Sequence, residues 1–159
     1  MAKLNVMIVC LGNICRSPLG GAVLAHLIKT RGLSADFDRI ESCGTAGYHI
    51  GEEPDERSVA VCRKHGVPIN SLAQQINPQH FHDFDWILAS DKNNLKNLQR
   101  IQPPGSRAQV VLFGSFDDQQ PIADPYYQRD GFEATYDQIL RYCNAFLAHL
   151  GYGDAQANL

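Results

Sequence analysis

Short apolar runs alternate with longer amphipathic stretches along this chain of 159 residues. The first run, Val6–Val9, is continuous and rich in β-branched residues, which is typical of a strand buried on both faces. The next stretch, Leu19–Ile28, repeats its apolar residues at helical spacing and stops before Gly32. A second strand is predicted over Phe37–Gly44. The chain therefore begins with a strand–helix–strand unit.

The same alternation continues to the other end of the chain. The further predicted elements are a helix over Asp55–His65, a short helical turn from Asn77, a strand over Asp85–Ala89, a helix over Lys92–Ile101, a strand over Gln109–Phe113 and a helix over Phe132–Leu150. Strands that alternate with helices at this spacing imply right-handed crossovers. We therefore predict a three-layer α/β/α, Rossmann-like fold with a four-stranded parallel central sheet in the order 2-1-3-4.

Length and composition indicate an ordinary globular protein. Residues 1–159 are expected to form a single domain, with a frayed tail over about 152–159. The net charge of −3 and the pI near 6.0 give no reason to expect a nucleic-acid or membrane surface. The first apolar run is too short to cross a bilayer, and no signal peptide is evident. We expect a cytoplasmic protein.

Cysteine and histidine usage adds no metal or cofactor. The five cysteines are an odd number and follow no metal-binding or disulfide-scaffold spacing. They are expected to be reduced thiols. The six histidines are scattered, and His80 and His82 have no third ligand nearby in the sequence. No zinc site and no cofactor are predicted.

Candidate chemistry lies between the first strand and the first helix. Cys10 ends the strand, and Ser17-Pro18 is expected to open the helix, with Ser17 as N-cap. A loop that closes onto a helix N-terminus directs several N–H groups into one concavity, which favours an anion. Gly12 and Asn13 tolerate the left-handed backbone that such a loop requires. The loop Leu11–Arg16 is therefore a predicted phosphate-binding site.

Two side chains of this segment suit phosphoryl chemistry. Arg16, six residues after Cys10, carries a planar fork of donors that matches two oxygens of a phosphoryl group. The loop amides and the helix dipole favour the thiolate form of Cys10, which is a nucleophile. A cysteine at a strand end is usually a core residue, and only the combination of features favours catalysis. A nucleotide-binding loop of the Walker type is excluded, because no Lys-Ser/Thr pair follows the glycine.

The sequence C-L-G-N-I-C-R-S-P at Cys10–Pro18, followed by Asp124-Pro125-Tyr126-Tyr127, resembles the low-molecular-weight protein tyrosine phosphatase family. The resemblance extends through about Gly151. It includes the segments Ser42–Thr45, His65-Gly66 and Phe84–Asp91.

This resemblance implies a protein-tyrosine phosphatase that hydrolyses phosphotyrosine and aryl phosphates through a phosphocysteine intermediate, without a metal. Cys10 is then the nucleophile, Arg16 and the loop amides hold the phosphoryl oxygens, and Asp124 is the acid and base. Spacing alone does not select Asp124 among the carboxylates. The implied partners are tyrosine-phosphorylated proteins, with phosphate or another oxyanion in the loop.

Further roles rest on the same resemblance. Tyr48, Tyr126 and Tyr127 are expected to wall the cleft around a phosphotyrosine ring, and the last two could themselves be phosphorylated. The substrate-binding residues of the loop are expected to be Leu11, Gly12, Asn13, Ile14, Cys15 and Ser17. Ser17 either donates a hydrogen bond to the Cys10 sulfur or acts as a plain N-cap. Cys15 is close enough in sequence to form a disulfide with an oxidised Cys10.

One departure from the family pattern falls early in the first helix. Gly20-Gly21 stands where relatives carry larger residues, commonly with a Glu, and each glycine costs up to about 1 kcal/mol relative to alanine. The pair either lets another backbone approach the loop or merely weakens the helix. The sequence leaves both interpretations open.

Three other functions are found on related loops or folds, and the sequence disfavours each. An arsenate reductase of this fold needs two further cysteines past the middle of the chain, and Gln74–Arg141 contains none. A protein-arginine phosphatase of the same superfamily tends to carry threonine where this chain has Ile14. A phosphoprotein-binding module would not need the combination of Cys10, Arg16 and Asp124. Tyrosine phosphatase activity is the favoured interpretation.

Overall fold

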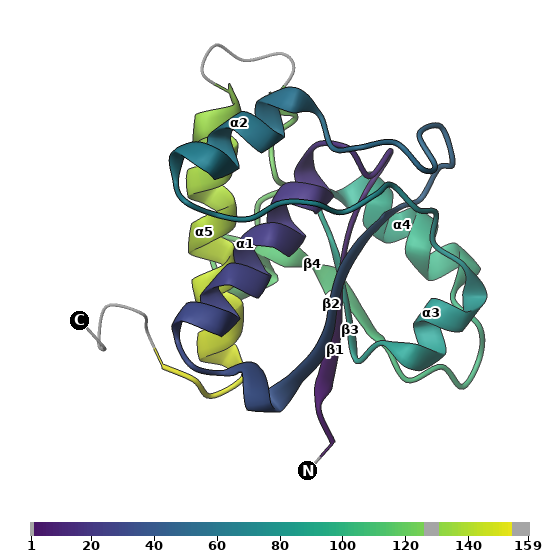
Figure 1. Cartoon of the computed structure of the whole chain (residues 1–159). Coiled ribbons are helices and arrows are strands. Elements are labelled where there is room, and N and C mark those ends of the chain that lie inside the picture. Colours follow the sequence, from purple (N-terminus) through teal and green to yellow (C-terminus); the bar gives the residue numbers. More distant parts are fainter. Residues whose placement is uncertain (1, 126–130, 154–159) are drawn as a thin grey trace.

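A four-stranded parallel sheet forms the centre of the computed structural model, which describes residues 2–125 and 131–153 (Figure 1). The order β2-β1-β3-β4 confirms the predicted topology. Its strands are β1 (Leu4–Cys10), β2 (Phe37–Gly44), β3 (Trp86–Ala89) and β4 (Gln109–Leu112). In the register, Cys10 lies beside Gly44, and Val9 lies beside both Cys43 and Ala89. The carboxyl ends of three strands therefore meet at one edge.

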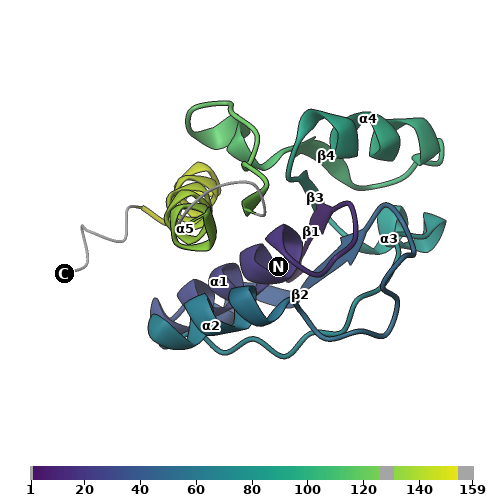
Figure 2. The ribbon, with the colours of Figure 1, turned by 90° about the horizontal axis from the view of Figure 1, so that it is seen from above.

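Helices cover both faces of the sheet, as the predicted three-layer fold requires (Figure 2). One layer contains α1 (Arg16–Thr30), α2 (Glu56–Lys64) and α5 (Gly131–His149), which contact one another. The other contains α3 (Pro78–Asp83) and α4 (Lys92–Ile101). Two short 3₁₀ helices, η1 (Ser34–Asp36) and η2 (Phe113–Phe116), complete the described elements.

Strand β1 explains why its sequence is a continuous apolar run. Val6 and Ile8 belong to the core under α1 and α5, whereas Met7 and Val9 belong to the core under α3 and α4. All four side chains are 0% exposed. Because alternate residues of a strand face opposite sides, both sides of β1 must be apolar. Because β1 is buried on both faces, the position of Cys10 at its end is fixed.

The predicted start of the first helix was wrong by two residues. Helix α1 begins at Arg16 with Cys15 as its N-cap, and no side chain caps it. Ser17 and Pro18 therefore lie inside the first turn. The hydroxyl of Ser17 is 3.0 Å from the sulfur of Cys10 instead of bonding to a helix amide. The chain turns directly from the loop into the helix, so that Ser17 faces the strand end.

The other predicted boundaries agree with the structure to within one or two residues. Phe113, predicted to end a strand, begins η2. Asn77 caps α3 through its side chain, and of the two candidates that the sequence offers for the cap of α4, Ser90 and Asp91, the structure uses Asp91. Residues 154–159 of the predicted frayed tail lie outside the described residues. Within residues 2–125 and 131–153, no helix combines the length and apolar character needed to cross a bilayer.

The packing of α1 against the sheet explains why position 20, the first of the two consecutive glycines, is a glycine. A Cβ at this position would lie 2.9 Å from Cγ2 of Ile8 in β1. Since Cβ atoms do not approach carbon atoms so closely, only glycine lets α1 pack against the sheet at this point. The close neighbour of Gly20 is thus a side chain of β1, and not another backbone approaching the loop as one of the two interpretations expected. A Cβ at Gly21 would lie 3.6 Å from Ser42 Cβ, an ordinary contact distance, so that packing does not require glycine there.

Candidate active site

The segment Leu11–Cys15 joins β1 to α1 as a loop whose carbonyl groups are bonded to neighbouring segments. The carbonyl oxygens of Cys10, Leu11 and Ile14 accept hydrogen bonds from the amides of Thr45 (3.0 Å), Ala46 (2.9 Å) and Asp55 (2.7 Å), respectively. The carbonyl of Cys15 accepts from the Leu19 amide at 3.3 Å. Because these carbonyl groups already bond to neighbouring segments, the backbone N–H groups of the loop are available to an anion in the space that the loop encloses.

Close packing of β2 against this loop depends on Gly44. A Cβ at Gly44 would lie 2.6 Å from the carbonyl oxygen of Leu11 and 3.1 Å from the carbonyl carbon of Gly12. Both contacts involve backbone atoms, which cannot rotate away. Any larger residue at position 44 would therefore displace the loop.

Asn13 holds the bend of the loop. Its backbone is left-handed, with φ of 59°, and its side chain is buried. The side-chain amide donates to Ser17 Oγ at 2.8 Å and to Ser42 Oγ at 2.9 Å. Its Oδ1 accepts from the backbone amide of Gln74 at 2.9 Å. These three bonds compensate for the strained backbone, so that the bend is fixed by β2, α1 and the chain before α3.

Cys10 lies at the floor of the loop with two polar neighbours. Its sulfur accepts a hydrogen bond from the Asn13 amide at 3.3 Å and lies 3.0 Å from Ser17 Oγ. Ser17 Oγ already accepts from Asn13, so its proton points to the sulfur or to the Cys43 carbonyl, which is 3.3 Å away. A thiolate at Cys10 would therefore receive two donors.

Three buried thiols outside the loop, those of Cys43, Cys62 and Cys143, have apolar surroundings. Burial raises the pKa of Cys43 and Cys143 far above that of an ordinary thiol, and raises the pKa of Cys62 to about 11. Desolvation disfavours the charged form. These three cysteines remain protonated at neutral pH and serve as core residues.

Arg16 is held by two acceptors at the sheet edge. Its Nη1 lies 2.9 Å from Asp91 Oδ2 and donates to the carbonyl of Ile122 at 2.9 Å. Asp91 lies two residues beyond the end of β3 at Ala89, and its other oxygen caps α4 by accepting from the Asn94 amide at 2.8 Å. The guanidinium is thus tied to two segments that are distant in the sequence.

A pocket of about 180 Å³ opens above the loop. Its lining residues are Cys10, Leu11, Gly12, Ile14, Cys15, Arg16, Tyr48, His49 and Asp124. The structure thus brings the sulfur, the guanidinium and a carboxyl group to one cavity. Tyr48 is 74% exposed at the rim. Tyr126 and Tyr127, predicted to complete the wall, lie outside the described residues.

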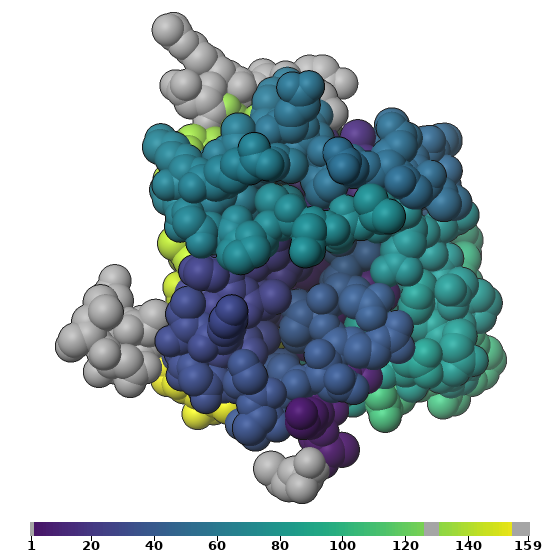
Figure 3. All heavy atoms as spheres, viewed as in Figure 1, coloured from purple at the N-terminus to yellow at the C-terminus, as the bar shows by residue number. Residues whose placement is uncertain are grey.

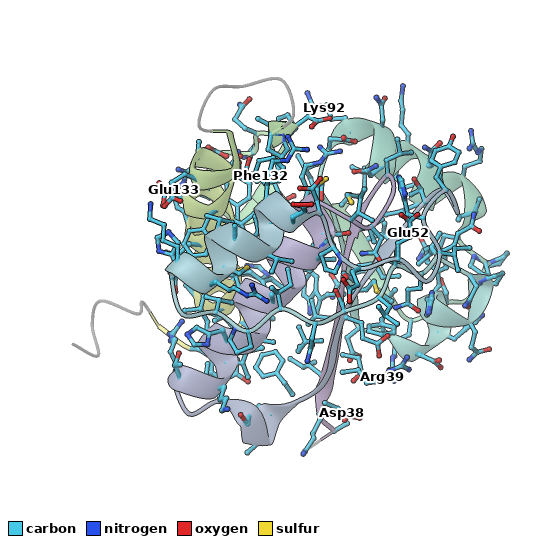
Figure 4. All side chains as sticks on the ribbon, turned by 45° about the horizontal axis from the view of Figure 1, so that its top comes forward. Asp38, Arg39, Glu52, Lys92, Phe132 and Glu133 are labelled. Atoms are coloured by element: carbon cyan, nitrogen blue, oxygen red, sulfur yellow. The ribbon has the colours of Figure 1, made fainter. Side chains whose placement is uncertain are left out.

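The segment that carries Asp124 is anchored on both sides. Just before it, the amide of Ile122 donates to the Ser90 carbonyl at 2.8 Å, while its carbonyl accepts from Arg16. Beyond it, Phe132 and Glu133 in the first turn of α5 lie next to α2 (Figure 4). The Arg57 guanidinium lies 4.7 Å from the centre of the Phe132 ring. Asp124 is therefore presented by a segment that Arg16 itself helps to fix.

Sequence reasoning missed four contacts of the site. His49 lines the pocket next to Gly12, and its Nδ1 lies 2.7 Å from Glu52 Oε2. Ser42 and Gln74 support Asn13, and Asp91 pairs with Arg16. Only Asp91 carried a signal in the sequence: after a strand adjacent to β1 it is expected either to act at the loop or to cap the next helix, and the structure gives it both contacts. Within the described residues, no three His, Cys, Asp or Glu side chains are grouped to hold a metal ion.

The fold and the site together define a class of α/β protein. In this class a cysteine at the end of a strand lies beneath a loop of backbone amides, and an arginine stands at the end of that loop. Comparison with known sequences identifies the family. The sequence model described as low molecular weight phosphotyrosine protein phosphatase matches residues 5–155, and the chain belongs to that family.

Curated relatives share much of the sequence. The chain is 42% identical over 151 residues to the low molecular weight phosphotyrosine protein phosphatase of Saccharomyces cerevisiae, covering 91% of this chain and 94% of the relative. It is 42% identical to the Homo sapiens protein of the same name, covering 92% and 95%.

Solved structures share the fold. A protein tyrosine phosphatase from Entamoeba histolytica superposes with a TM-score of 0.88 at 28% identity, covering 96% of this chain and 98% of that one. A Drosophila arginine phosphatase superposes with a TM-score of 0.86 at 36% identity, covering 95% and 100%.

Proposed function

We propose that this protein is a protein-tyrosine phosphatase that hydrolyses phosphotyrosine and aryl phosphates through a phosphocysteine intermediate. One observation carries the proposal. The Cys10 sulfur accepts from the Asn13 amide and lies against Ser17 Oγ, in a cavity that also contains Arg16 and Asp124. The nucleophile, the cation and the carboxyl group that the reaction needs are therefore all at one place.

In the first step, the Cys10 thiolate attacks phosphorus and the bond from phosphorus to the phenolic oxygen breaks. The loop amides and Arg16 stabilise the charge on the three equatorial oxygens. Asp124, as the neutral acid, donates its proton to the departing oxygen. The products of this step are a phenol, phosphocysteine and an ionised Asp124.

In the second step, water attacks the phosphocysteine and the phosphorus–sulfur bond breaks. Asp124 takes the proton from the water, which restores its neutral form. The Ser17 hydroxyl stabilises the departing thiolate of Cys10 by hydrogen bonding. Inorganic phosphate and the free thiolate result. Every group that moves a proton or an electron pair is thus supplied by the chain, and we propose no metal or cofactor.

The choice of phosphorylated side chain depends on the pocket walls. Tyr48 at the rim presents an aromatic surface on which a phenyl ring can stack. Ile14 contributes an apolar wall where the arginine phosphatases of this superfamily tend to carry threonine. The similarity to a Drosophila arginine phosphatase makes phosphoarginine the second candidate substrate. Tyr48 and Ile14 favour phosphotyrosine.

One experiment tests both the mechanism and the substrate. The wild-type protein is assayed for phosphate release from a phosphotyrosine peptide and from a phosphoarginine peptide of the same sequence, with and without EDTA. We expect turnover of the phosphotyrosine peptide, unaffected by EDTA, and its loss in Cys10→Ser. Cys62→Ser, which alters a buried thiol outside the pocket, is the matched control and should retain activity. Activity that survives Cys10→Ser would refute the mechanism, and preference for phosphoarginine would refute the substrate.

The cellular substrate is proposed to be a tyrosine-phosphorylated protein, met in the cytoplasm. A reducing compartment suits an enzyme that acts through the thiolate of Cys10.

A further inference from the structure

The segment 117–123, which leads to Asp124, lies along one face of α5 (Figure 2). The polar residues of α5 that bond to it are Thr135, Gln138, Arg141 and Tyr142. Their spacing of three or four residues places them on the same side of the helix. The later helix residues bond to the start of the segment and the earlier ones to its end. The segment is therefore held along its length, in the direction opposite to α5.

Ile122, two residues before Asp124, is held from the side of the sheet. Its side chain is 1% exposed. Its amide donates to the Ser90 carbonyl at 2.8 Å, and its carbonyl accepts from Arg16 at 2.9 Å. These bonds fix Ile122 itself. The polar groups of the residues on either side of it bond to α5 instead.

Gln138 of α5 bonds to both neighbours of Ile122. Its Nε2 donates to the Pro121 carbonyl at 3.0 Å, and its Oε1 accepts from the Ala123 amide at 3.4 Å. Nε2 also donates to the Tyr142 hydroxyl at 3.0 Å. A rotated amide would place Oε1 against the Pro121 carbonyl, so the hydrogen bonds assign the orientation of the side chain. Gln138 thus links the residues before and after Ile122.

Helix α5 is a firm support for this link. Its apolar face belongs to the same core as α1 and α2, and Ile139, next to Gln138, is 0% exposed. From the side of α1 and α2, atoms of α5 are visible only along the left side of the molecule (Figure 3). The buried Thr135 adds a longer hydrogen bond, of 3.5 Å, to the Ala123 carbonyl. Because a close-packed core resists displacement of its helices, Gln138 is a fixed point for the end of the segment.

We propose that Gln138 is a positioning residue for Asp124. Ala123 immediately precedes Asp124, so that the orientation of the Ala123 backbone sets the direction in which the Asp124 side chain leaves the chain. Asp124 is itself exposed at the phosphate pocket, and its placement depends on hydrogen bonds more than on burial. The inference rests on the proposed function, since it assigns Gln138 an effect on the acid that protonates the leaving oxygen. Displacement of such a group by about 1 Å can cost up to about 10²-fold in rate.

The test uses Gln138→Met, which keeps the length of the side chain and removes its hydrogen bonds to the segment. We expect kcat/KM for a phosphotyrosine peptide to fall about tenfold. The value for p-nitrophenyl phosphate should fall less, because p-nitrophenolate leaves readily without a proton. In an Asp124→Asn background the same substitution should change kcat/KM by less than about twofold, since no acid is left to misplace.

The matched control is Asn144→Met on the same helix. Asn144 bonds to Arg31 and to the Leu140 carbonyl, and these contacts lie away from the segment. This variant should keep the wild-type ratio of kcat/KM between the two substrates. Circular dichroism confirms the folding of each variant.

Amide hydrogen exchange, followed by NMR, tests the contact without relying on activity. In Gln138→Met the Ala123 amide loses its acceptor and should exchange about tenfold faster or more, relative to the Ile122 amide, whose acceptor is the Ser90 carbonyl. Asn144→Met should leave this ratio of exchange rates unchanged.

Three results would overturn the proposal. An unchanged ratio of exchange rates would show that Gln138 does not hold the segment. Equal losses of kcat/KM on the two substrates, or a loss of the same size in the Asp124→Asn background, would show a purely structural role. Failure of the proposed function is recognised separately, because Asp124→Asn by itself would then affect both substrates equally. That result would also remove the effect of Gln138 on catalysis, whatever the exchange rates.

Discussion

Arg16 and Asp91 form an ion pair, with Nη1 2.9 Å from Oδ2, across two adjacent strand ends of the sheet. The same Nη1 donates to the Ile122 carbonyl, so that one edge of the guanidinium is anchored. The remaining nitrogens are left for a phosphoryl group. We therefore expect Asp91 to act on catalysis through Arg16, as a positioning residue.

Replacement of Asp91 by Asn should separate this ion pair from the helix cap. Asparagine keeps an oxygen for the Asn94 amide, because it is as good an N-cap as aspartate. It removes the charge opposite Arg16. We expect kcat/KM for p-nitrophenyl phosphate to fall about tenfold, with the urea midpoint near that of the wild type. Asp91→Ala, the comparison variant, should lose in addition about 1 kcal/mol of unfolding free energy. Equal activity of Asp91→Asn and wild type would contradict the role.

The acid role of Asp124 predicts a dependence on the leaving group. Tyrosine needs a proton as it departs, whereas p-nitrophenolate is a weak base and leaves readily without one. Asp124→Asn should therefore reduce kcat/KM, which reports the steps up to phenol release and not the hydrolysis of phosphocysteine, by about 10²–10⁴-fold on a phosphotyrosine peptide and by less on p-nitrophenyl phosphate. Steady-state rates on both substrates measure the difference. Equal losses would remove Asp124 as proton donor. Asp137→Asn, at an exposed position of α5, is the control.

Asn13 combines a left-handed backbone with three side-chain hydrogen bonds. Two substitutions separate the effects of these two features on the free energy of unfolding. Asn13→Gly loses the bonds but suits φ of 59°. Asn13→Ala loses the same bonds and adds backbone strain. We expect the alanine variant to be the less stable of the two by about 1 kcal/mol, as measured by urea unfolding. A glycine variant less stable than the alanine variant would show that the bend is not strained.

The hydrogen bond from Tyr142 to Asp118 predicts that the stability difference between the wild type and Tyr142→Phe depends on pH. The Tyr142 hydroxyl, with help from the Gln120 amide and Arg141, holds the pKa of Asp118 below its usual 3.8. A carboxyl whose pKa is lower in the folded state stabilises the fold above its unfolded pKa, and this contribution is lost as the pH falls through the folded value. Tyr142→Phe should therefore be less stable than wild type at neutral pH, and the difference should shrink below about pH 4.

Urea unfolding between about pH 3 and pH 7 measures this effect. The matched control is Tyr136→Phe, on the same helix, whose ring stacks on His65 at 4.0 Å. Its stability difference should not follow the titration of Asp118. A Tyr142→Phe difference that is constant over the whole range would refute the linkage.

Cys15 is the predicted partner of an oxidised Cys10. Peroxide converts the Cys10 thiolate to a sulfenic acid, and the Cys15 thiol then forms the disulfide with release of water. In Cys15→Ser this protection is absent, so oxidation should proceed to forms that thiols cannot reduce. We expect dithiothreitol to restore activity to peroxide-treated wild type and to restore much less to the variant. Equal recovery would refute the protective disulfide, and Cys62→Ser is the control.

The sequence predicted the sheet and the loop because their signals are local. The continuous apolar run of Val6–Val9 indicates a strand buried on both faces, and the structure buries its alternate residues in two separate cores. Gly12 and Asn13 indicate a tight bend, and Asn13 has the positive φ that this requires. Backbone preferences of this kind are properties of single residues and their neighbours.

The contacts that were missed depend on the register of distant segments. Asn13 bonds Ser42 and Gln74, and Arg16 bonds Asp91, only because β1 lies beside β2 and β3 with a particular alignment. The incorrect N-cap at Ser17 has the same origin. A serine before a proline is a good N-cap in isolation. Here the Ser17 hydroxyl lies against the Cys10 sulfur instead of bonding to a backbone amide at the start of α1.

The hydrogen bonds that the loop carbonyls accept from neighbouring segments affect the thermodynamics of anion binding. Since Thr45, Ala46 and Asp55 already fix the peptide planes of the loop, an arriving oxyanion meets dipoles that are aligned before it binds. Little conformational entropy then has to be lost in the encounter. Calorimetry of inorganic phosphate binding should accordingly show a small heat-capacity change, as for a rigid receptor and unlike a chain that folds around its guest.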